Sequence, residues 1–397
     1  MPPENNDFAA DRARVTQLSV SNFRSLGRDV VLRLDPLTVL VGPNGSGKSN
    51  VVDALRFLAD CMEKGLGGAI NDRSGIEACR RWNRSSGGAP YVVKLGVTVA
   101  LPGGGATYDI ELTGSAIEEY SVKSELARVL SGGQEHVLHV VQGKLEHAPD
   151  GLRPSVDAQN LALPLVGGDT RFQPLFSVLR NIAIYSIYPN TLREPQKYSA
   201  SKPMARHGEN WVSILKDQLE SWKPQLVAAL NKLTGDIDDV KVAPAAGYLV
   251  ARFRRTIEKK HSRATKWFDA YQESDGTLRV AGIVTALLQE PPIPVIGIEE
   301  PELTIHPGAI ALLYDHLIQA SRRSQVIVTT HSPELLDLVS EDAIRVVSRS
   351  AERGTTVAPL APSQREAVRA GLMTLGEVLR TEGLQQELPL SPAGDED

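Results

Sequence analysis

The chain has little cysteine and no long apolar run, and each absence excludes a class of protein. Cys61 and Cys79 are the only cysteines in 397 residues, and they show neither paired metal-ligand spacing nor a disulfide framework. We therefore expect two buried, reduced thiols. No apolar run reaches the roughly 18 residues that a membrane-spanning helix needs, and the polar start MPPENNDFAADRAR is unlike a secretory signal. These observations predict a cytoplasmic protein that does not enter a membrane.

The chain also lacks a strong excess of positive charge. Its formal net charge is -5 at pH 7, which argues against a protein that coats nucleic acid by charge alone. Any nucleic-acid site must therefore be a local patch. Hydrophobic residues make up 42% of the chain and charged residues 23%, as in soluble globular proteins.

What the sequence does contain is a phosphate-binding loop at residues 42–49, which read GPNGSGKS. The apolar run at residues 37–41 predicts a buried parallel strand before it. Apolar residues at helical spacing, from Val51 to Met62, predict a helix after it. Strand, glycine loop and helix therefore follow one another in the order that phosphate binding requires.

The chemistry of this loop indicates ATP and Mg²⁺ as cofactors. Glycines let successive backbone N–H groups turn inward around the β- and γ-phosphates, at a helix N-terminus that favours negative charge. Lys48 adds a point charge, and the Ser49 hydroxyl is a predicted Mg²⁺ ligand. The predicted nucleotide-binding residues of this segment are Gly42, Pro43, Asn44, Gly45, Ser46, Gly47, Lys48, Ser49 and Asn50.

Two further strand ends predict the rest of the nucleotide site. The apolar run at residues 295–298 ends in Glu299 and Glu300, and carboxyl ends of parallel strands face the crevice that holds the phosphates. The first acid is the predicted Mg²⁺ ligand, and the second is predicted to orient or deprotonate the attacking water. His331, which follows the run at 326–330, is a predicted γ-phosphate contact.

Together these residues resemble the ABC-type ATPases of the RecF, SMC and OLD group, and within it the bacterial AAA-like ATPases without long coiled coils. The resemblance covers roughly residues 14–62 and 268–347. It is carried by the motifs SNFRSL, GPNGSGKSN, SDGTLR, IEEPELTIHP and TTHSPELL.

The resemblance implies a head-to-tail homodimer that sandwiches ATP between the phosphate loop of one subunit and a serine-glycine signature of the other. Ser274 and Gly276 match that signature and would contact the γ-phosphate in trans. By the same resemblance Glu299 is the Mg²⁺ acid, where the group commonly has aspartate, Glu300 is the catalytic base, and His331 is the switch histidine.

A second signature-like sequence, LSGGQ at residues 130–134, lies far before the acid pair. A functional signature must open the helix that leads into the acid-bearing strand. We therefore interpret residues 130–134 as a coincidental turn.

The order of predicted elements indicates an α/β fold: an ABC-type P-loop ATPase head with a mainly parallel sheet flanked by helices, plus an inserted antiparallel-β and helical lobe. Strands are expected at 15–20, 30–34, 91–100, 107–113 and 137–146, a loop at 150–170, and a helix at 211–233. The predicted organisation is a flexible lead-in at 1–13, head segments at 14–64 and 266–384, the inserted lobe at 65–265, and a disordered tail at 385–397.

A local basic patch follows the predicted helix, and it is the best candidate for contact with DNA. The alternative is a solvated hairpin with a basic face. A cluster at Arg73, Arg80, Arg81 and Arg84 is a weaker candidate. The basic residues of the patch are Arg252, Arg254, Arg255, Lys259, Lys260, Arg263 and Lys266.

These features lead to two functional hypotheses. In the first, the chain is an ATPase that dimerises on ATP and serves as a sensor or motor subunit with a separate nuclease or toxin, in phage defence or DNA maintenance. The chain shows no nuclease-like acid cluster after His331, so we expect an effector partner. In the second, it is a slow, nucleotide-gated scaffold of the RecF type that binds DNA or protein during repair.

Overall fold

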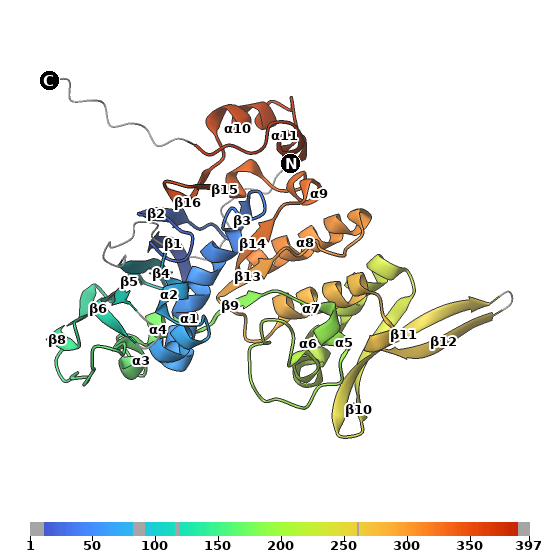
Figure 1. Cartoon of the computed structure of the whole chain (residues 1–397). Coiled ribbons are helices and arrows are strands. Elements are labelled where there is room, and N and C mark those ends of the chain that lie inside the picture. The colour runs from blue at the N-terminus through green and yellow to red at the C-terminus, as the bar shows by residue number, and fades with distance from the viewer. Residues whose placement is uncertain (1–11, 82–91, 116–118, 260–261, 388–397) are drawn as a thin grey trace.

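The computed structural model describes residues 12–81, 92–115, 119–259 and 262–387, and contains three sheets surrounded by helices (Figure 1). A six-stranded sheet at the centre has the order β16-β15-β3-β14-β13-β9 and is parallel except for the β15–β16 pair. This confirms the predicted α/β fold with a mainly parallel sheet. Its strands are β3 (Leu37–Val41), β9 (Ile182–Tyr185), β13 (Val295–Glu299), β14 (Gln325–Thr330), β15 (Ile344–Ser350) and β16 (Gly354–Pro359).

Helices cover both faces of this sheet, which explains why every residue of β3, β13 and β14 is buried. On one face α1 (Lys48–Asn71) packs between the six-stranded sheet and an antiparallel sheet. On the other lie α6 (Trp211–Thr234), α7 (Asp275–Leu288) and α8 (Ile310–Ser321). The shorter helices are α2 (Ile76–Cys79), α3 (Leu163–Val166), α4 (Gln173–Arg180), α5 (Pro189–Arg193), α9 (Pro333–Leu336), α10 (Pro362–Arg369) and α11 (Leu375–Thr381).

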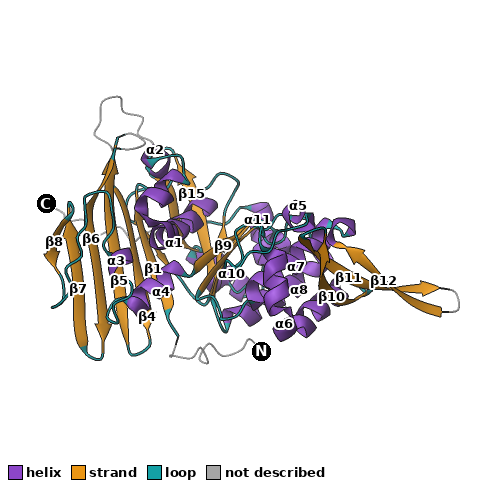
Figure 2. Ribbon diagram, turned by 90° about the horizontal axis from the view of Figure 1, so that it is seen from below, coloured by secondary structure: helices purple, strands orange, loops and turns teal. Residues whose placement is uncertain are grey.

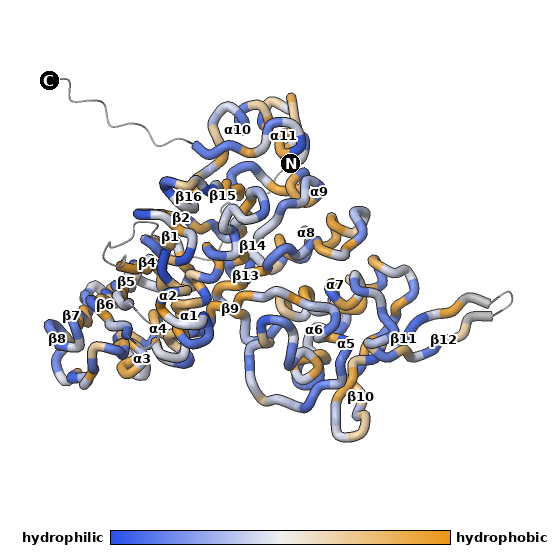
Figure 3. The backbone as a smooth tube through the Cα atoms, in the orientation of Figure 1, coloured by the Kyte–Doolittle hydropathy of each residue, from blue (hydrophilic) through white to orange (hydrophobic). Residues whose placement is uncertain are grey.

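The hydropathy pattern agrees with this layering. Along α6, α7 and α8 the tube in Figure 3 changes repeatedly between polar and apolar colours, typical of helices that bury one side. Gly297 shows how closely the layers approach: a Cβ there would lie 2.4 Å from Ile184 Cδ1 and 3.1 Å from Val52 Cγ1 of α1. No helix in the described ranges is both apolar enough and long enough to span a bilayer.

The antiparallel sheet joins segments that the sequence analysis placed in different units. Its order is β2-β1-β4-β5-β6-β7-β8, so β1 pairs with β2 on one side and with β4 on the other. Strands from the expected head and from the expected insertion at 65–265 therefore share one sheet, and β9 of that insertion extends the central sheet. The strands are β1 (Arg14–Ser21), β2 (Val30–Arg33), β4 (Val93–Leu101), β5 (Gly104–Gly114), β6 (Tyr120–Ser131), β7 (Gln134–Val141) and β8 (Lys144–His147).

Strand β6 was missed from the sequence because a charged residue occupies its buried side. Glu125 is 0% exposed and interrupts the apolar alternation. Its carboxylate accepts hydrogen bonds from Tyr108 (2.9 Å) and from the backbone N–H groups of Ala162 (2.5 Å) and Leu163 (2.9 Å). The same loop that was expected to be irregular thus supplies the partners that make this burial possible.

A three-stranded antiparallel arm projects from the helical side of the molecule, as Figure 2 shows. It consists of β10 (Ile237–Ala245), β11 (Tyr248–Lys259) and β12 (Ser262–Asp269). The preceding helix α6 confirms the helix predicted at 211–233.

The described structure extends further toward the C-terminus than we expected. Residues 385–387, predicted to be disordered, are ordered because the Gln386 side chain donates to the carbonyl oxygens of Val346 (2.7 Å) and Thr356 (2.9 Å). Residues 1–11 and 388–397 of the predicted lead-in and tail lie outside the described ranges. Cys61 and Cys79 are free and buried, as predicted, and burial raises the pKa of Cys79 to about 11.

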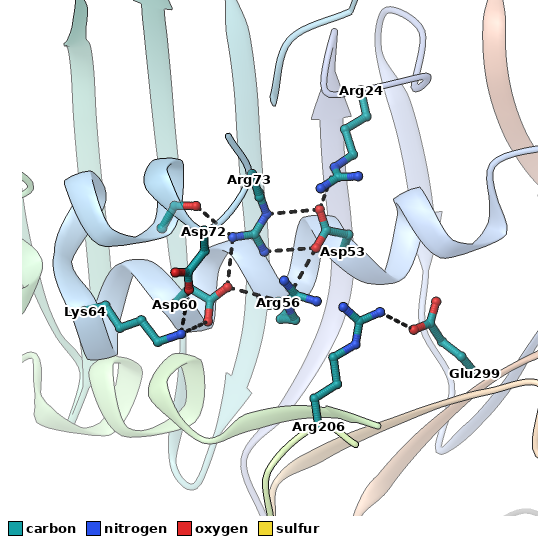
Figure 4. A network of polar contacts seen from close by, with 10 residues as sticks. Arg24, Asp53, Arg56, Asp60, Lys64, Asp72, Arg73, Arg206 and Glu299 are labelled. Carbon is teal, nitrogen blue, oxygen red and sulfur yellow. Dashed lines mark hydrogen bonds and ion pairs between the residues drawn. The ribbon is translucent and has the colours of Figure 1, made fainter. Parts of the chain in front are cut away.

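A buried ionic network fixes α1 in place behind the phosphate loop (Figure 4). Arg73, whose side chain is 0% exposed, lies 2.9 Å from Asp53 and 2.8 Å from Asp60, both on α1. It also donates to the carbonyl oxygen of Ala69 at 2.9 Å. Arg24, from the loop after β1, contacts Asp53 at 2.7 Å. Because Arg73 is fully buried and paired, it cannot belong to a nucleic-acid patch.

We predict that Arg73→Ala destabilises the fold, because it leaves Asp53 and Asp60 buried without their main partner. Breaking a buried pair on one side typically costs about 3 to 5 kcal/mol. Lys64→Ala is the matched control, since Lys64 pairs with Asp72 in the same network (2.7 Å) but is half exposed, where a pair contributes about 0 to 1 kcal/mol. Urea unfolding measures both, and equal losses would contradict the role of Arg73.

Candidate functional site

The phosphate loop has the geometry that its sequence predicts. It joins the end of β3 to the first turn of α1, and residues 43–45 at its tip are exposed. Gly47 precedes α1 with φ of 107°, a conformation that L side chains rarely adopt. A Cβ there would also lie 2.4 Å from Thr355 Oγ1. The loop therefore needs glycine at this position for two independent reasons.

Residues distant in sequence support the loop from beneath. Thr355 of β16 donates to the carbonyl oxygen of Ser46 at 2.7 Å, and its hydroxyl lies 2.8 Å from that of Ser25. Asn50 donates to Ser25 at 2.6 Å. Asn50, predicted to bind nucleotide, thus has a structural partner, and Ser25 gives the SNFRSL motif a physical role. No sequence signal pointed to Thr355, which lies some three hundred residues away.

Lys48 folds back onto its own loop. Its Nζ donates to the carbonyl oxygens of Gly42 (2.7 Å) and Pro43 (3.3 Å). Burial lowers the pKa of Lys48, whereas the charges of Glu300 and Glu302 act in the opposite direction. The lysine is therefore close to the acidic strand end as well as to the loop, which is where a charge that neutralises phosphate oxygens is needed.

The order of the central strands brings the three predicted motifs together. β14 lies between β3 and β13, with Val41 opposite Thr330 and Glu299 opposite Thr329. The phosphate loop, His331 and the acid pair therefore all emerge at the same edge of the sheet. His331 Nδ1 lies 3.4 Å from Glu300 Oε1, so the predicted base and the predicted switch histidine are neighbours.

The peptide of Glu300 is held in an unusual conformation. Its φ is 44°, and its N–H donates to the carbonyl oxygen of Thr329 at 2.9 Å. Arg279 of α7 donates to the carbonyl oxygen of Glu300 at 2.7 Å and to that of Ile187, after β9, at 2.7 Å. Arg279 belongs to the SDGTLR motif, yet its role as a link between the signature helix and the acid loop was missed.

Glu299, the predicted Mg²⁺ ligand, is engaged with another side chain. Its Oε2 lies 2.6 Å from Nη2 of Arg206, in the loop before α6 (Figure 4). Across the part of the chain that is described, no group of three or more His, Cys, Asp or Glu side chains could hold a metal ion. A nucleotide-bound Mg²⁺ needs only one or two protein ligands beside phosphate oxygens and waters, so Glu299 and Ser49 fit that role once Arg206 is displaced.

Glu302 is a third acid of this strand end, which the sequence analysis did not select. It is 8% exposed, and Thr330 donates to its Oε1 at 2.5 Å, while its Oε2 is buried with no hydrogen-bond partner in the described part of the chain. Burial raises the pKa of Glu302. The only signal in the sequence was its place in EEPE, directly beyond the acid pair.

The signature residues lie at the start of α7, as predicted. Ser274 caps this helix by accepting a hydrogen bond from the N–H of Thr277 at 3.2 Å. Ser274 and Asp275 are exposed, whereas Gly276 packs so tightly that a Cβ would lie 2.9 Å from the carbonyl oxygen of Thr304. Exposure leaves the first turn of α7 accessible to a partner.

The LSGGQ sequence forms the end of the β6–β7 hairpin. Ser131 pairs with Gln134, and Gly132 and Gly133 between them have φ of 57° and 80°. Two successive positive φ values are typical of a tight hairpin turn, so the segment is a turn, as predicted.

In the basic stretch of β11 and β12, acids neutralise the arginines. Arg252 lies 2.6 Å from Asp269, Arg254 lies 2.6 Å from Asp238, and Arg255 lies 2.6 Å from Asp236 and also contacts Glu273. Lys266 lies over the Phe268 ring at 5.3 Å. The side chains of Lys259, Lys260 and Arg263 lie outside the described ones. These pairs favour the alternative of a solvated hairpin over a DNA contact.

Comparisons with known proteins agree with the motifs. Residues 14–66 match the model of the RecF/RecN/SMC N-terminal domain, and residues 166–337 match an AAA domain described as a putative AbiEii toxin of a type IV toxin–antitoxin system. These matches support an ABC-type ATPase of the RecF/SMC/OLD group. The two matched segments contain the phosphate loop, the signature, the acid pair and His331.

Individual relatives show how much of the chain is shared. It is 24% identical to the OLD nuclease of Thermus scotoductus over 388 residues, which cover 89% of this chain and 65% of the nuclease. It is 33% identical to the chromosome partition protein Smc of Mycobacterium tuberculosis over 149 residues, which cover 32% of this chain and 12% of Smc. A solved Smc head bound to the C-winged helix domain of ScpA aligns with 88% of this chain and 99% of that chain at 15% identity and a TM-score of 0.49.

We predict that Glu302→Gln raises the free energy of unfolding at pH 8 by on the order of 1 kcal/mol, because it removes a buried charge with an unpaired oxygen. The pKa of Glu302 is raised in the folded state, so its contribution to stability is present below the unfolded pKa and is lost as pH rises. The gain should therefore shrink between pH 8 and pH 5 in urea unfolding.

Glu334→Gln is the control of opposite sign. A backbone hydrogen bond, followed by the Ser332 hydroxyl and Arg380, lowers the pKa of Glu334, so its removal should destabilise the fold at pH 8. If both variants shift the free energy of unfolding in the same direction, burial does not determine how the charge of Glu302 affects stability.

Proposed function

We propose that this chain binds and hydrolyses ATP, and that ATP holds two chains together in a head-to-tail dimer. One observation carries the proposal: the phosphate loop, Glu299, Glu300 and His331 meet at one edge of the central sheet, because β3, β14 and β13 are neighbours. Phosphoryl transfer depends mainly on positioning and charge, and this edge supplies both.

Each residue has a distinct proposed role at the nucleotide. Backbone N–H groups of residues 44–49 cradle the phosphates, and Lys48 exchanges its two loop carbonyls for phosphate oxygens. Ser49 and Glu299 hold Mg²⁺, which when bound neutralises charge on the phosphate oxygens. Glu299 is available for this only after its ion pair with Arg206 opens.

Glu300 is proposed to take the proton from the attacking water. Its side chain is partly exposed, and the strained backbone at φ 44° directs it away from the buried strand. His331, at 3.4 Å, can donate a hydrogen bond to Glu300 or to the γ-phosphate. Arg279 fixes the carbonyl of Glu300, so the base cannot move independently of α7.

The proposed dimer rests on the exposed start of α7. Ser274 and Asp275 are exposed in one chain, at a helix end that favours anions. A second chain that places its γ-phosphate there would complete the site with Ser274 and Gly276. We propose this arrangement for the ATP-bound state.

The biological role is proposed from the relatives. The OLD nuclease and the domain described as a putative AbiEii toxin associate this kind of ATPase with nucleases and toxins, which supports a sensor or motor subunit that acts with such an effector in phage defence or DNA maintenance. The second candidate is a slow, nucleotide-gated scaffold of the RecF type. The Arg206–Glu299 pair and the self-occupied loop at Lys48 favour it, since both must open before each turnover.

We predict that Glu300→Gln lowers the hydrolysis rate about 10²- to 10⁴-fold, or roughly 3 to 5 kcal/mol of barrier, while ATP binding remains. Light scattering with saturating ATP and Mg²⁺ should then show a stable dimer. Lys48→Ala is the control: it weakens ATP binding and should stay monomeric. A monomeric Glu300→Gln variant with ATP bound would disprove the sandwich.

We predict that Ser274→Ala abolishes hydrolysis whereas Ser131→Ala leaves it unchanged. Ser274 opens α7 beside the acid loop, but Ser131 belongs to the β6–β7 hairpin. Steady-state phosphate release measures both variants. If Ser131→Ala abolishes hydrolysis and Ser274→Ala does not, the LSGGQ segment is the signature.

A further inference from the structure

A second pocket lies at the edge of the central sheet opposite the nucleotide site. Pro36, Pro294 and Gln325 line it, and these residues stand at the amino ends of β3, β13 and β14, whereas the phosphate loop and acids stand at the carboxyl ends. The start of β1 and the segment after α8 close its sides. Its volume is about 440 Å³, which is larger than a simple ion needs and within the range of small-molecule sites.

Four arginines surround this pocket, and their charge is only partly compensated. Arg323 pairs with Glu290 at 2.6 Å, and Arg12 donates to the carbonyl oxygen of Arg323 at 3.0 Å. Arg14 and Arg322 are exposed and have no side-chain partner among the residues that the structure describes. In a chain with a net charge of -5, this local excess of positive charge favours an anionic ligand.

A buried hydroxyl in the wall independently indicates a ligand. Ser324 lines the pocket and is 6% exposed, yet its Oγ has no hydrogen-bond partner among the residues that the structure describes. The guanidinium of Arg323, by contrast, already donates to Glu290 and to the carbonyl oxygens of Leu287 (3.2 Å) and Gln289 (2.8 Å). Buried polar atoms are nearly always paired, so an acceptor is missing at this place. A phosphate oxygen accepts from both a hydroxyl and a guanidinium.

Three prolines form an apolar part of the wall. Pro36, Pro292 and Pro294 present rigid rings, which cannot donate a backbone hydrogen bond. Such a surface suits a flat organic body attached to the phosphate rather than a free inorganic ion. We propose that this pocket binds a phosphorylated nucleoside, either as a free mononucleotide or as the 5′-phosphorylated end of a nucleic-acid strand.

The test uses the full-length protein and AMP, which lacks the β- and γ-phosphates that the phosphate loop holds. Isothermal titration calorimetry should show binding of AMP to the wild type and to Lys48→Ala alike. The Arg14→Ala/Arg322→Ala double variant should bind at least tenfold more weakly, because it removes two charged hydrogen-bond donors to the phosphate. Ser324→Ala should weaken binding as well. Both arginines are exposed, so these variants should unfold at the same urea concentration as the wild type.

Short single-stranded DNA with and without a 5′-phosphate distinguishes the two sources. If the phosphorylated strand binds, displaces AMP, and loses affinity in the double variant, the ligand is a strand end. If AMP binds and neither strand competes, the ligand is a free nucleotide. The proposal is overturned if the wild type binds neither AMP nor the phosphorylated strand, if the double variant binds them as tightly as the wild type, or if Lys48→Ala alone removes AMP binding.

Discussion

The adjacency of three parallel strands determines the site on which the proposed chemistry depends. β14 forms hydrogen bonds with β3 on one side and β13 on the other, although β3 lies more than two hundred residues before β13 in the chain. This pairing places Lys48, Glu300 and His331 at one edge. Most of the antiparallel sheet and the whole arm lie between β3 and β13 in the chain, and they do not interrupt the order of the central strands. The tight contact of Gly297 with Val52 shows how little freedom the layers retain.

Arg279 links the acid loop at Glu300 to α7, whose first turn is exposed. Its guanidinium is buried between α7, the acid loop and the residue after β9, and burial lowers its pKa without removing its charge at neutral pH. A displacement of α7 therefore changes the position of the Glu300 carbonyl. Ser274 stands at the exposed start of the same helix. In the proposed dimer, a contact with a second chain at Ser274 would therefore affect the position of Glu300 through the Arg279 side chain. This would be a mechanical route between the proposed subunit interface and the proposed base.

The sequence was sufficient for the elements that follow local rules and insufficient for those that depend on distant partners. The phosphate loop, the acid-bearing strand and the helix that begins after Ser274 were all predicted, because glycine spacing and apolar runs act within a few positions. Strand β6 was missed, because Glu125 is tolerated inside only through N–H groups supplied by Ala162 and Leu163. Thr355 and Arg279 were missed for the same reason, since their roles exist only after folding brings their partners close.

The ion pair between Arg206 and Glu299 occupies the carboxylate that is proposed to bind Mg²⁺. The guanidinium of Arg206 offsets the negative charge that Glu299 shares with the neighbouring acids Glu300 and Glu302. Similarly, the ammonium group of Lys48 donates to the carbonyl oxygens of Gly42 and Pro43. In the proposed mechanism, nucleotide with Mg²⁺ replaces both sets of contacts, so part of its binding energy would be used to open the site. Arg206 lies in the loop that leads into α6, and α6 packs against β10 of the arm. Opening of the Arg206–Glu299 pair would therefore affect the helix that supports the arm.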